Sequence, residues 1–260
     1  MSADDQSLLY TYDALGRLTQ VAGPLGNGCA PRRAFGNFKH NARNLRTFAA
    51  YIPCGLVSPA LLAESAFHGP DGSLLFLRSN KPALSFTSSE VHVWLEGEPV
   101  ALVARGARRS PFERVTFLHD DHLGRPVGMT DSLGALVWRP EYEPFGKSLA
   151  PRTNTVPGPG HRFPGQWEAR ASIDLPGGDT TPMGQIAALT DNWHRTYVQR
   201  WGRYSQPDPI GLQGGINLFG YAKQNPEVYF DSLGLSCKSN WQFFWDWWLE
   251  LGETERWYRP

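Results

Sequence analysis

Two aspartates open the same short motif near the end of this sequence. Asp208 begins Asp-Pro-Ile-Gly-Leu and Asp231 begins Asp-Ser-Leu-Gly-Leu. Two carboxylates held close together do not both ionise easily, so one keeps a proton and polarises a carbonyl while the other accepts a proton from water. This is the chemistry of an aspartic protease. The same residues also fit ordinary turns, because aspartate, proline and glycine are common turn formers.

The other clusters of polar residues predict neither a metal nor a cofactor. The stretch from His119 to His122 reads His-Asp-Asp-His, but it has no recognisable third ligand, so we interpret it as structural. A small basic cluster lacks interleaved aromatic residues and indicates a solvated loop rather than a nucleic-acid site. Its members are Arg105, Arg108 and Arg109. The cysteines are odd in number and have no CxxC spacing, so we expect free thiols at Cys29, Cys54 and Cys237.

The composition describes a folded chain without a strong charge preference. Lysine plus arginine equals aspartate plus glutamate at 25 each, so charge alone favours neither nucleic acid nor an anionic membrane as a partner. A hydrophobic fraction of 41% is enough to build a core. We find no signal peptide and no apolar run long enough for a transmembrane helix, so we expect no membrane span.

The elements that must position the aspartates are predicted to be short strands. The chain has 27 glycines and 21 prolines, spread along it in turn-forming dipeptides. Residues 8–21 alternate strand formers around an Asp-Ala-Leu-Gly turn, which predicts a β-hairpin. The pattern returns at Asp131-Ser-Leu-Gly and, more loosely, at Asp71-Gly72 and Glu143-Pro-Phe-Gly146. Further strands are predicted over 74–77, 91–95, 100–103, 115–118 and 135–138. The fold class is therefore all-β.

Changes in composition divide the chain into four parts. Residues 1–150 hold the hairpins, and residues 151–191 are rich in proline, glycine and threonine and predict long loops. Residues 192–235 hold the paired aspartate motifs, and residues 236–260 form a tail of different character. In the tail, Trp241, Phe244, Trp245 and Trp248 have the spacing of one face of an amphipathic helix. Its polar face is acidic, which argues against binding to a membrane surface.

An ordered series of motifs resembles the Rhs, or YD-repeat, proteins. Tyr10-Thr-Tyr-Asp-Ala-Leu-Gly-Arg-Leu is similar to the YD repeat of Rhs proteins and teneurins. Stretches that resemble the Rhs repeat-associated core then follow in the family's order over roughly residues 8–235. They are Val93-Trp-Leu-Glu-Gly-Glu-Pro-Val-Ala, His119-Asp-Asp-His-Leu-Gly-Arg-Pro, Glu141-Tyr-Glu-Pro-Phe-Gly, Phe163-Pro-Gly-Gln, Asn192-Trp-His-Arg, Gly202-Arg-Tyr, Asp208-Pro-Ile-Gly-Leu, Asn217-Leu-Phe-Gly-Tyr, Asn225-Pro and Asp231-Ser-Leu-Gly-Leu.

The resemblance implies a spiralling β-sheet shell that encloses a C-terminal cargo, often a toxin. It also implies autoproteolysis after the second motif, at the Leu235–Ser236 bond, with Asp208 and Asp231 as the catalytic pair. Arg195 matches the family's arginine, which would orient the scissile carbonyl or favour one ionised carboxylate. The resemblance further implies that Gly211, Leu212 and Gly234 shape the two turns. The family has proline after the second aspartate where this chain has Ser232.

Three functions follow as hypotheses. In the first, the chain encloses its own C-terminal tail as intramolecular cargo and severs it. In the second, the chain is a non-catalytic, truncated YD-repeat module that serves as a scaffold or interaction surface. In the third, the tail itself is a small toxin or a peptide that binds an immunity protein. The resemblance also suggests the remaining shell and secretion proteins as partners, and export by a dedicated secretion system.

Overall fold

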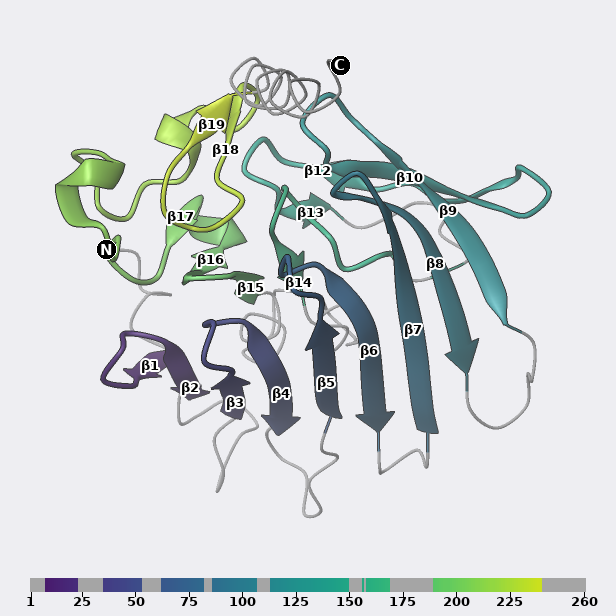
Figure 1. The fold of residues 1–260 in the computed structure, drawn as a ribbon, viewed down its shortest axis with the longest axis horizontal. Coiled ribbons are helices and arrows are strands. Elements are labelled where there is room, and N and C mark those ends of the chain that lie inside the picture. Colours follow the sequence, from purple (N-terminus) through teal and green to yellow (C-terminus); the bar gives the residue numbers. More distant parts are fainter. Residues whose placement is uncertain are drawn as a thin grey trace, which may run out of the picture.

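The computed structural model describes residues 8–22, 35–52, 62–81, 86–106, 113–149, 156, 158–168 and 189–239. Over these residues the fold is built from antiparallel β-sheets and short 3₁₀ helices (Figure 1). The predicted all-β class is therefore confirmed.

The largest sheet has eleven strands that follow one another in chain order. Each strand is antiparallel to the next, so the sheet is a continuous meander of hairpins. Its strands are β1 (Leu9–Tyr12), β2 (Leu18–Ala22), β3 (Phe35–His40), β4 (Arg46–Ile52), β5 (Leu62–His68), β6 (Leu74–Lys81), β7 (Phe86–Leu95), β8 (Glu98–Gly106), β9 (Arg114–Asp120), β10 (Pro126–Asp131) and β11 (Leu136–Trp138).

The C-terminal half adds smaller sheets. A two-stranded sheet pairs β12 (Glu141–Tyr142) with β13 (Ser148–Leu149), and another pairs β18 (Tyr229–Phe230) with β19 (Lys238–Ser239). A four-stranded sheet contains β14 (Trp167–Glu168), β15 (Leu189–Asn192), β16 (Arg195–Val198) and β17 (Arg203–Tyr204). The 3₁₀ helices are η4 (Gln199–Trp201), η5 (Gly211–Gly214) and η6 (Ala222–Gln224).

The hairpins form where the repeated turn residues predict them. The turns at Asp13, Asp71, Asp131 and Glu143 connect β1 to β2, β5 to β6, β10 to β11 and β12 to β13. Each turn contains a glycine with a positive φ, which a side chain would strain. The glycine lies three residues after Asp13, Asp131 and Glu143, and it directly follows Asp71. The strands predicted over 74–77, 91–95, 100–103, 115–118 and 135–138 all fall within β6 to β9 and β11, apart from Ala135 at the edge of the last.

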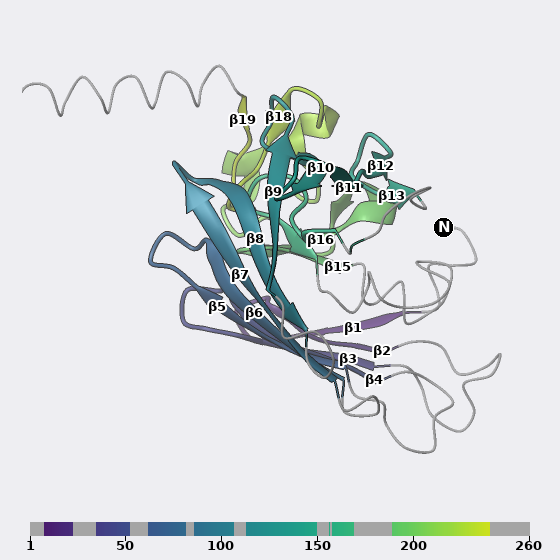
Figure 2. The same cartoon turned by 90° about the vertical axis from the view of Figure 1, so that its right-hand side faces the viewer.

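One face of the large sheet is covered by the C-terminal half. Figure 2 shows β15 and β16 lying over this face. A core cluster joins the sheet residues Leu18, Val21, Phe38, Tyr51 and Leu77 to Trp167, Leu189 and Val198. Apolar burial of this kind supplies most of the driving force for packing two layers. The later motifs are thus packed against the large sheet through a shared core.

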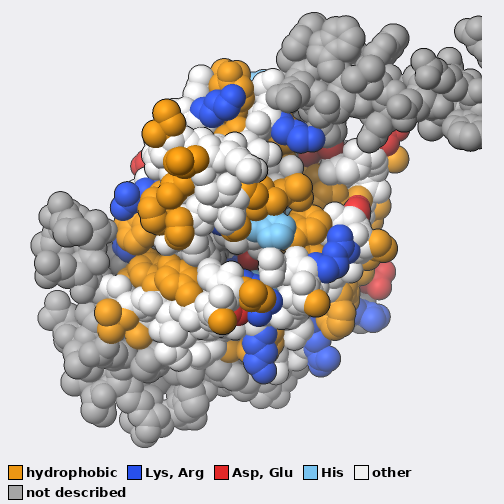
Figure 3. All heavy atoms as spheres, turned by 60° about the vertical axis from the view of Figure 1, so that its left-hand side comes forward, with side chains coloured by type: hydrophobic (Ala, Val, Ile, Leu, Met, Phe, Trp, Pro, Cys, Tyr) orange, Lys and Arg blue, Asp and Glu red, His pale blue; other side chains and the backbone are white. Residues whose placement is uncertain are grey.

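The opposite face of the sheet leaves apolar side chains exposed. Phe67, Val91, Val93 and Phe117 are each more than 40% exposed, on strands β5, β7 and β9. Figure 3 shows one side of the molecule, on which hydrophobic side chains gather in patches among basic side chains and a histidine. The described surface is therefore mixed rather than uniformly polar.

Within residues 151–191, for which the composition predicts long loops, the structure describes residues 156, 158–168 and 189–191. Residues 158–168 are irregular but packed, and they end in β14. Their backbone groups bond to one another, as in Glu168 N–H to Gly160 O at 2.7 Å and Arg162 N–H to Gln166 O at 3.2 Å. Internal pairing of this kind allows an irregular segment to be buried, and a buried ion pair joins Arg162 to Glu168.

Other expectations concern residues outside this description. The predicted amphipathic helix of the tail, with Trp241 to Trp248, lies outside the described residues, as do Cys29 and Cys54. Cys237 is a free thiol. In the part of the chain that the structure describes, no helix is long and apolar enough to cross a membrane.

Candidate active site

The turn at Asp231 is a variant of the repeated hairpin turn. At Asp13, Asp121 and Asp131, one carboxylate oxygen accepts the backbone N–H groups of the second and fourth following residues. Asp231 Oδ1 likewise accepts the N–H of its fourth following residue, Leu235, at 2.9 Å. Local hydrogen bonding of this type is the usual preference of aspartate in turns. The second oxygen of Asp231 remains available for a different partner.

Arg195 supplies that partner and joins the two aspartates. Its Nη2 lies 2.8 Å from Asp231 Oδ2, and its Nη1 lies 3.1 Å from Asp208 Oδ2. The side chains of all three residues are at most 5% exposed. The structure therefore brings together three of the residues that the sequence analysis selected, from the start of β16, the loop before η5 and the loop after β18.

The guanidinium also holds the backbone that precedes the predicted scissile bond. Arg195 Nε donates to the carbonyl of Gly234 at 2.6 Å. Gly234 has a φ of +68°, and a Cβ there would collide with the carbonyl oxygen of Asn192. Glycine is thus required both by the backbone conformation and by the close approach of the two segments. Leu235 follows, half-buried, with its N–H already bound to Asp231.

Tyr204 and Asn192 complete the surroundings of Asp231. The Tyr204 hydroxyl donates to Asp231 Oδ2 at 2.9 Å, and Asn192 Nδ2 donates to the Asp231 carbonyl at 2.9 Å. Burial, followed by the nearby Asp231 charge, raises the pKa of Tyr204 well above its ordinary value, so its hydroxyl remains a donor. The Arg195 guanidinium stacks on the Tyr204 ring at 3.7 Å from its centroid.

Asp208 and the Leu235 carbonyl lie on the same side of Gly214. A Cβ built on Gly214 would overlap Asp208 Oδ2 and would lie 2.8 Å from the carbonyl oxygen of Leu235. Asp208 Oδ1 accepts the N–H of Ile210 at 3.1 Å, which orients the carboxylate. The carbonyl of the predicted scissile bond is therefore adjacent to one carboxylate, while the other holds the N–H of the same residue.

Two other motifs support the site: one contacts the Asp231 turn, and the other anchors the residues beside Arg195 to the large sheet. A Cβ on Gly165, in Phe163-Pro-Gly-Gln, would collide with the backbone of Ser232, so these backbones are in close contact. Trp193 Nε1 donates to the Arg43 carbonyl at 2.7 Å, and its ring packs against Gly72 in the turn between β5 and β6. The residues that flank Arg195 thus dock onto the hairpin turns of the large sheet.

His194 contacts both the turn between β3 and β4 and the Asp231 turn. Asn44 Nδ2 lies 3.0 Å from His194 Nδ1, and the backbone N–H of His194 donates to the Leu233 carbonyl at 3.3 Å. Burial, followed by the charge of Arg195, lowers the pKa of His194. A neutral imidazole accepts a hydrogen bond from the Asn44 amide at Nδ1.

The other motif residues have simpler environments. Gly211 has a φ of +62° and nothing within 4 Å of its Cβ position, and Leu212 is 74% exposed on η5. Gly211 therefore shapes its turn, whereas Leu212 contributes no buried contact. His119 bonds to Thr130, and His122 bonds to the Glu227 carbonyl. Within the described ranges, no group of three or more acidic, histidine or cysteine side chains is arranged to hold a metal ion.

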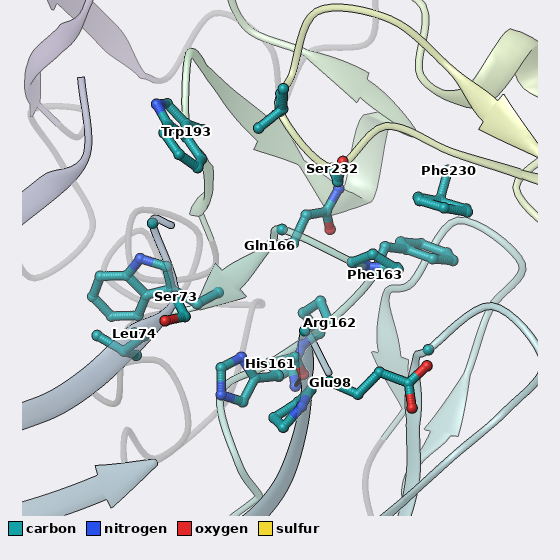
Figure 4. Close-up of a pocket in the computed structure, with 18 of the residues that line it drawn as sticks. Ser73, Leu74, Glu98, His161, Arg162, Phe163, Gln166, Trp193, Phe230 and Ser232 are labelled. Carbon is teal, nitrogen blue, oxygen red and sulfur yellow. Dashed lines mark hydrogen bonds between the residues drawn. The ribbon is translucent and has the colours of Figure 1, made fainter. Parts of the chain in front are cut away.

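A cavity of about 370 Å³ lies beside the Asp231 turn. Figure 4 shows Trp193, Gln166 and Ser232 on one side of it and His161, Arg162 and Glu98 on another. Its lining includes Ser232 and Leu233 of the turn, but Asp208, Asp231 and Arg195 are not among its described lining residues. The cavity is thus a neighbour of the aspartates and not the place where they meet.

Tyr204, Asn192 and Gly214 contact the site although no residue pattern predicts a role for them. Tyr204 and Asn192 stand inside motifs that the analysis quoted, in Gly202-Arg-Tyr and Asn192-Trp-His-Arg, but no role was assigned to them. Gly214 is one of two adjacent glycines after the first aspartate motif. A double glycine predicts only a turn, so its contact with both functional groups emerges from the structure.

The amino-acid sequence is similar to the sequences of known Rhs proteins and toxins. The profile of the family described as RHS protein matches residues 115–151. Toxin protein Tse5 of Pseudomonas aeruginosa is 31% identical over 233 residues, which cover 87% of this chain and 15% of Tse5. The chain is an Rhs-family protein. Double-stranded DNA deaminase toxin A of Burkholderia cenocepacia is 32% identical over 139 residues, which cover 52% of this chain and 8% of that toxin.

Solved structures confirm the Rhs fold. A structure of the Photorhabdus luminescens Tc holotoxin pore that contains a TccC3 variant matches 89% of this chain with a TM-score of 0.68 and 16% identity. A TcdB2-TccC3-TEV crystal structure matches 88% of it with a TM-score of 0.63 and 18% identity. This Rhs chain spans 10% of the length of each of these two chains. At such identities the likeness establishes the fold alone.

Proposed function

We propose that this chain is the self-cleaving portion of a polymorphic-toxin-type Rhs protein, and that it cuts its own Leu235–Ser236 bond. The observation that carries the proposal is the position of Leu235 between two carboxylates. Asp231 Oδ1 holds its N–H at 2.9 Å, and its carbonyl oxygen and the Asp208 carboxylate both border Gly214. Arg195 binds both carboxylates and the preceding carbonyl.

The charges suit an acid–base mechanism. The two carboxylates and the Arg195 guanidinium together carry one net negative charge. When one carboxylate takes up a proton it becomes the acid, and the other carboxylate remains the base. The base accepts a proton from water as the water oxygen adds to the carbonyl carbon of Leu235. The acid supplies a proton to the nitrogen of Ser236 as the carbon–nitrogen bond breaks. The products are a carboxyl group on Leu235 and an amine on Ser236.

The released segment would be the tail of residues 236–260. This agrees with the names of relatives that are toxins and with the shell-forming fold of the solved neighbours. In this proposal the tail is the cargo of the chain itself, and the rest of a longer shell is a further partner. Ser232 replaces the family's proline, which leaves the cleavage turn with more freedom in the unfolded chain.

The test is the mass of the purified chain over a range of pH. The wild type is expected to yield fragments 1–235 and 236–260, whereas Asp208→Asn and Asp231→Asn should stay whole. Asp131→Asn is a matched control, because Asp131 and Asp231 open the same Asp-Ser-Leu-Gly turn but only Asp231 contacts Arg195. This control should be cut like the wild type. An intact wild type at every pH would refute the proposal and favour a non-catalytic module.

A further inference from the structure

Gly214 lacks space for a side chain, although its backbone conformation does not require glycine. Its φ is not positive, so the backbone conformation itself would accept alanine. The position is in η5, which has no buried residue. A Cβ there would nevertheless overlap Asp208 Oδ2, lie 2.9 Å from Asp208 Cγ and lie 2.8 Å from the carbonyl oxygen of Leu235. Its neighbours are thus the carboxylate and the carbonyl, not the core.

We propose that Gly214 is a positioning residue of the cleavage reaction, and that its missing side chain is what lets the Asp208 carboxylate face the Leu235 carbonyl. This inference rests on the proposed self-cleavage. The Asp208 side chain is 5% exposed and is held by Arg195 on one side and the Ile210 N–H on another. A methyl group at Gly214 therefore cannot be accommodated without moving the carboxylate or the Leu235 carbonyl away from its place.

Gly214 belongs to a more exposed part of the chain than the buried residues of the site. Asp231, Arg195 and Tyr204 are buried, whereas the residues of η5 are partly or fully exposed. Figure 1 shows η5 at the outer edge of the molecule. A side chain on Gly214 would thus be added at the exposed edge of the site, next to the Asp208 carboxylate and the Leu235 carbonyl.

Other glycines near the site have structural reasons that Gly214 lacks. Gly165 and Gly234 both have a positive φ, and each packs against buried backbone. Substituting them would strain the fold as well as the site. Gly214 differs, because the three atoms nearest to its Cβ position all belong to the Asp208 carboxylate and the Leu235 carbonyl.

The experiment measures the rate of cleavage after the chain is refolded from denaturant. Gly214→Ala is expected to lower the first-order rate by about 100-fold or more, as displacement of a reacting group by about 1 Å does. Gly214→Val should be slower still. Gly106→Ala is the matched control, since Gly106 also lacks a positive φ and has nothing within 4 Å of its Cβ position. The control should cleave at the wild-type rate.

Two further readouts separate positioning from folding. The melting temperature of Gly214→Ala should match that of Gly106→Ala. The pH profile of its residual cleavage should differ from the wild type, because the methyl group moves the Asp208 carboxylate relative to Arg195, while Gly106→Ala should keep the wild-type profile.

The outcomes distinguish this inference from the function on which it rests. A wild type that is cut at Leu235–Ser236 together with a Gly214→Ala chain that is cut equally fast would overturn the positioning role alone. A Gly214→Ala chain that fails to fold would also overturn it, by assigning Gly214 to the fold. An uncut wild type would overturn both proposals.

Discussion

The Arg195–Asp231 ion pair offers a quantitative test of the site. The perturbation is Arg195→Met, made in the Asp208→Asn chain, which is expected to stay whole so that intact chains are compared. In that background Arg195 is left with one carboxylate partner. Both side chains are nearly inaccessible, at 2% and 1% exposure, so methionine would leave the Asp231 charge buried without its cation.

The expected cost is about 3 kcal/mol of unfolding free energy. Removing one partner of a buried ion pair costs about 3–5 kcal/mol, because the remaining charge is uncompensated. The lower end applies here, because Tyr204 and the Leu235 N–H still donate to the Asp231 carboxylate. For a chain of this size, the loss corresponds to a fall of roughly 6–12 °C in melting temperature.

The assay is chemical or thermal unfolding followed by tryptophan fluorescence. Adding Asp231→Asn to Arg195→Met should recover part of the loss, since the unpaired charge is then gone. Arg17→Met is the matched control: Arg17 pairs with Asp13 at a repeat turn but is 22% exposed, so its removal should cost at most about 1 kcal/mol. An Arg195→Met chain as stable as its parent, or a double variant with fully additive losses, would refute the reasoning.

Two further predictions concern the docking of the site and its pH response. Gly72→Ala should be less stable than Gly97→Ala by about 1–3 kcal/mol, and should cleave more slowly, because both glycines have a positive φ but only the Cβ at Gly72 would collide with Trp193; equal melting temperatures would contradict this. Burial, followed by the charges of Glu98 and Asp121, raises the pKa of Asp120 from 3.8 to about 7. The stability that this carboxyl contributes is therefore complete below its unfolded pKa and lost as pH rises through about 7. Asp120→Asn should raise the melting temperature at pH 8 and change it little at pH 4, and a uniform effect at both would argue against the assignment.

The hairpins were predictable because their determinants are local. At Asp13 and Asp131 the carboxylate bonds to backbone N–H groups within four residues, and a glycine takes the positive φ that closes the turn. Such contacts depend on the order of residues and not on distant packing. The packing of residues 158–168 is different, because no local pattern in this irregular segment predicts its burial. The segment is packed because its backbone groups pair with one another and Arg162 pairs with Glu168.

By itself, the sequence determined the all-β class and the repeated turns, since turn chemistry is a property of the linear chain. The order of its motifs also identified Arg195, Asp208 and Asp231 as candidate site residues. Only the tertiary structure decided that Arg195 binds both carboxylates, that Tyr204 contacts Asp231, and that Gly214 borders both Asp208 and the Leu235 carbonyl. These contacts join residues from different strands and loops. They form because the C-terminal sheets pack on one face of the large sheet, and such long-range packing is not encoded in any single stretch of residues.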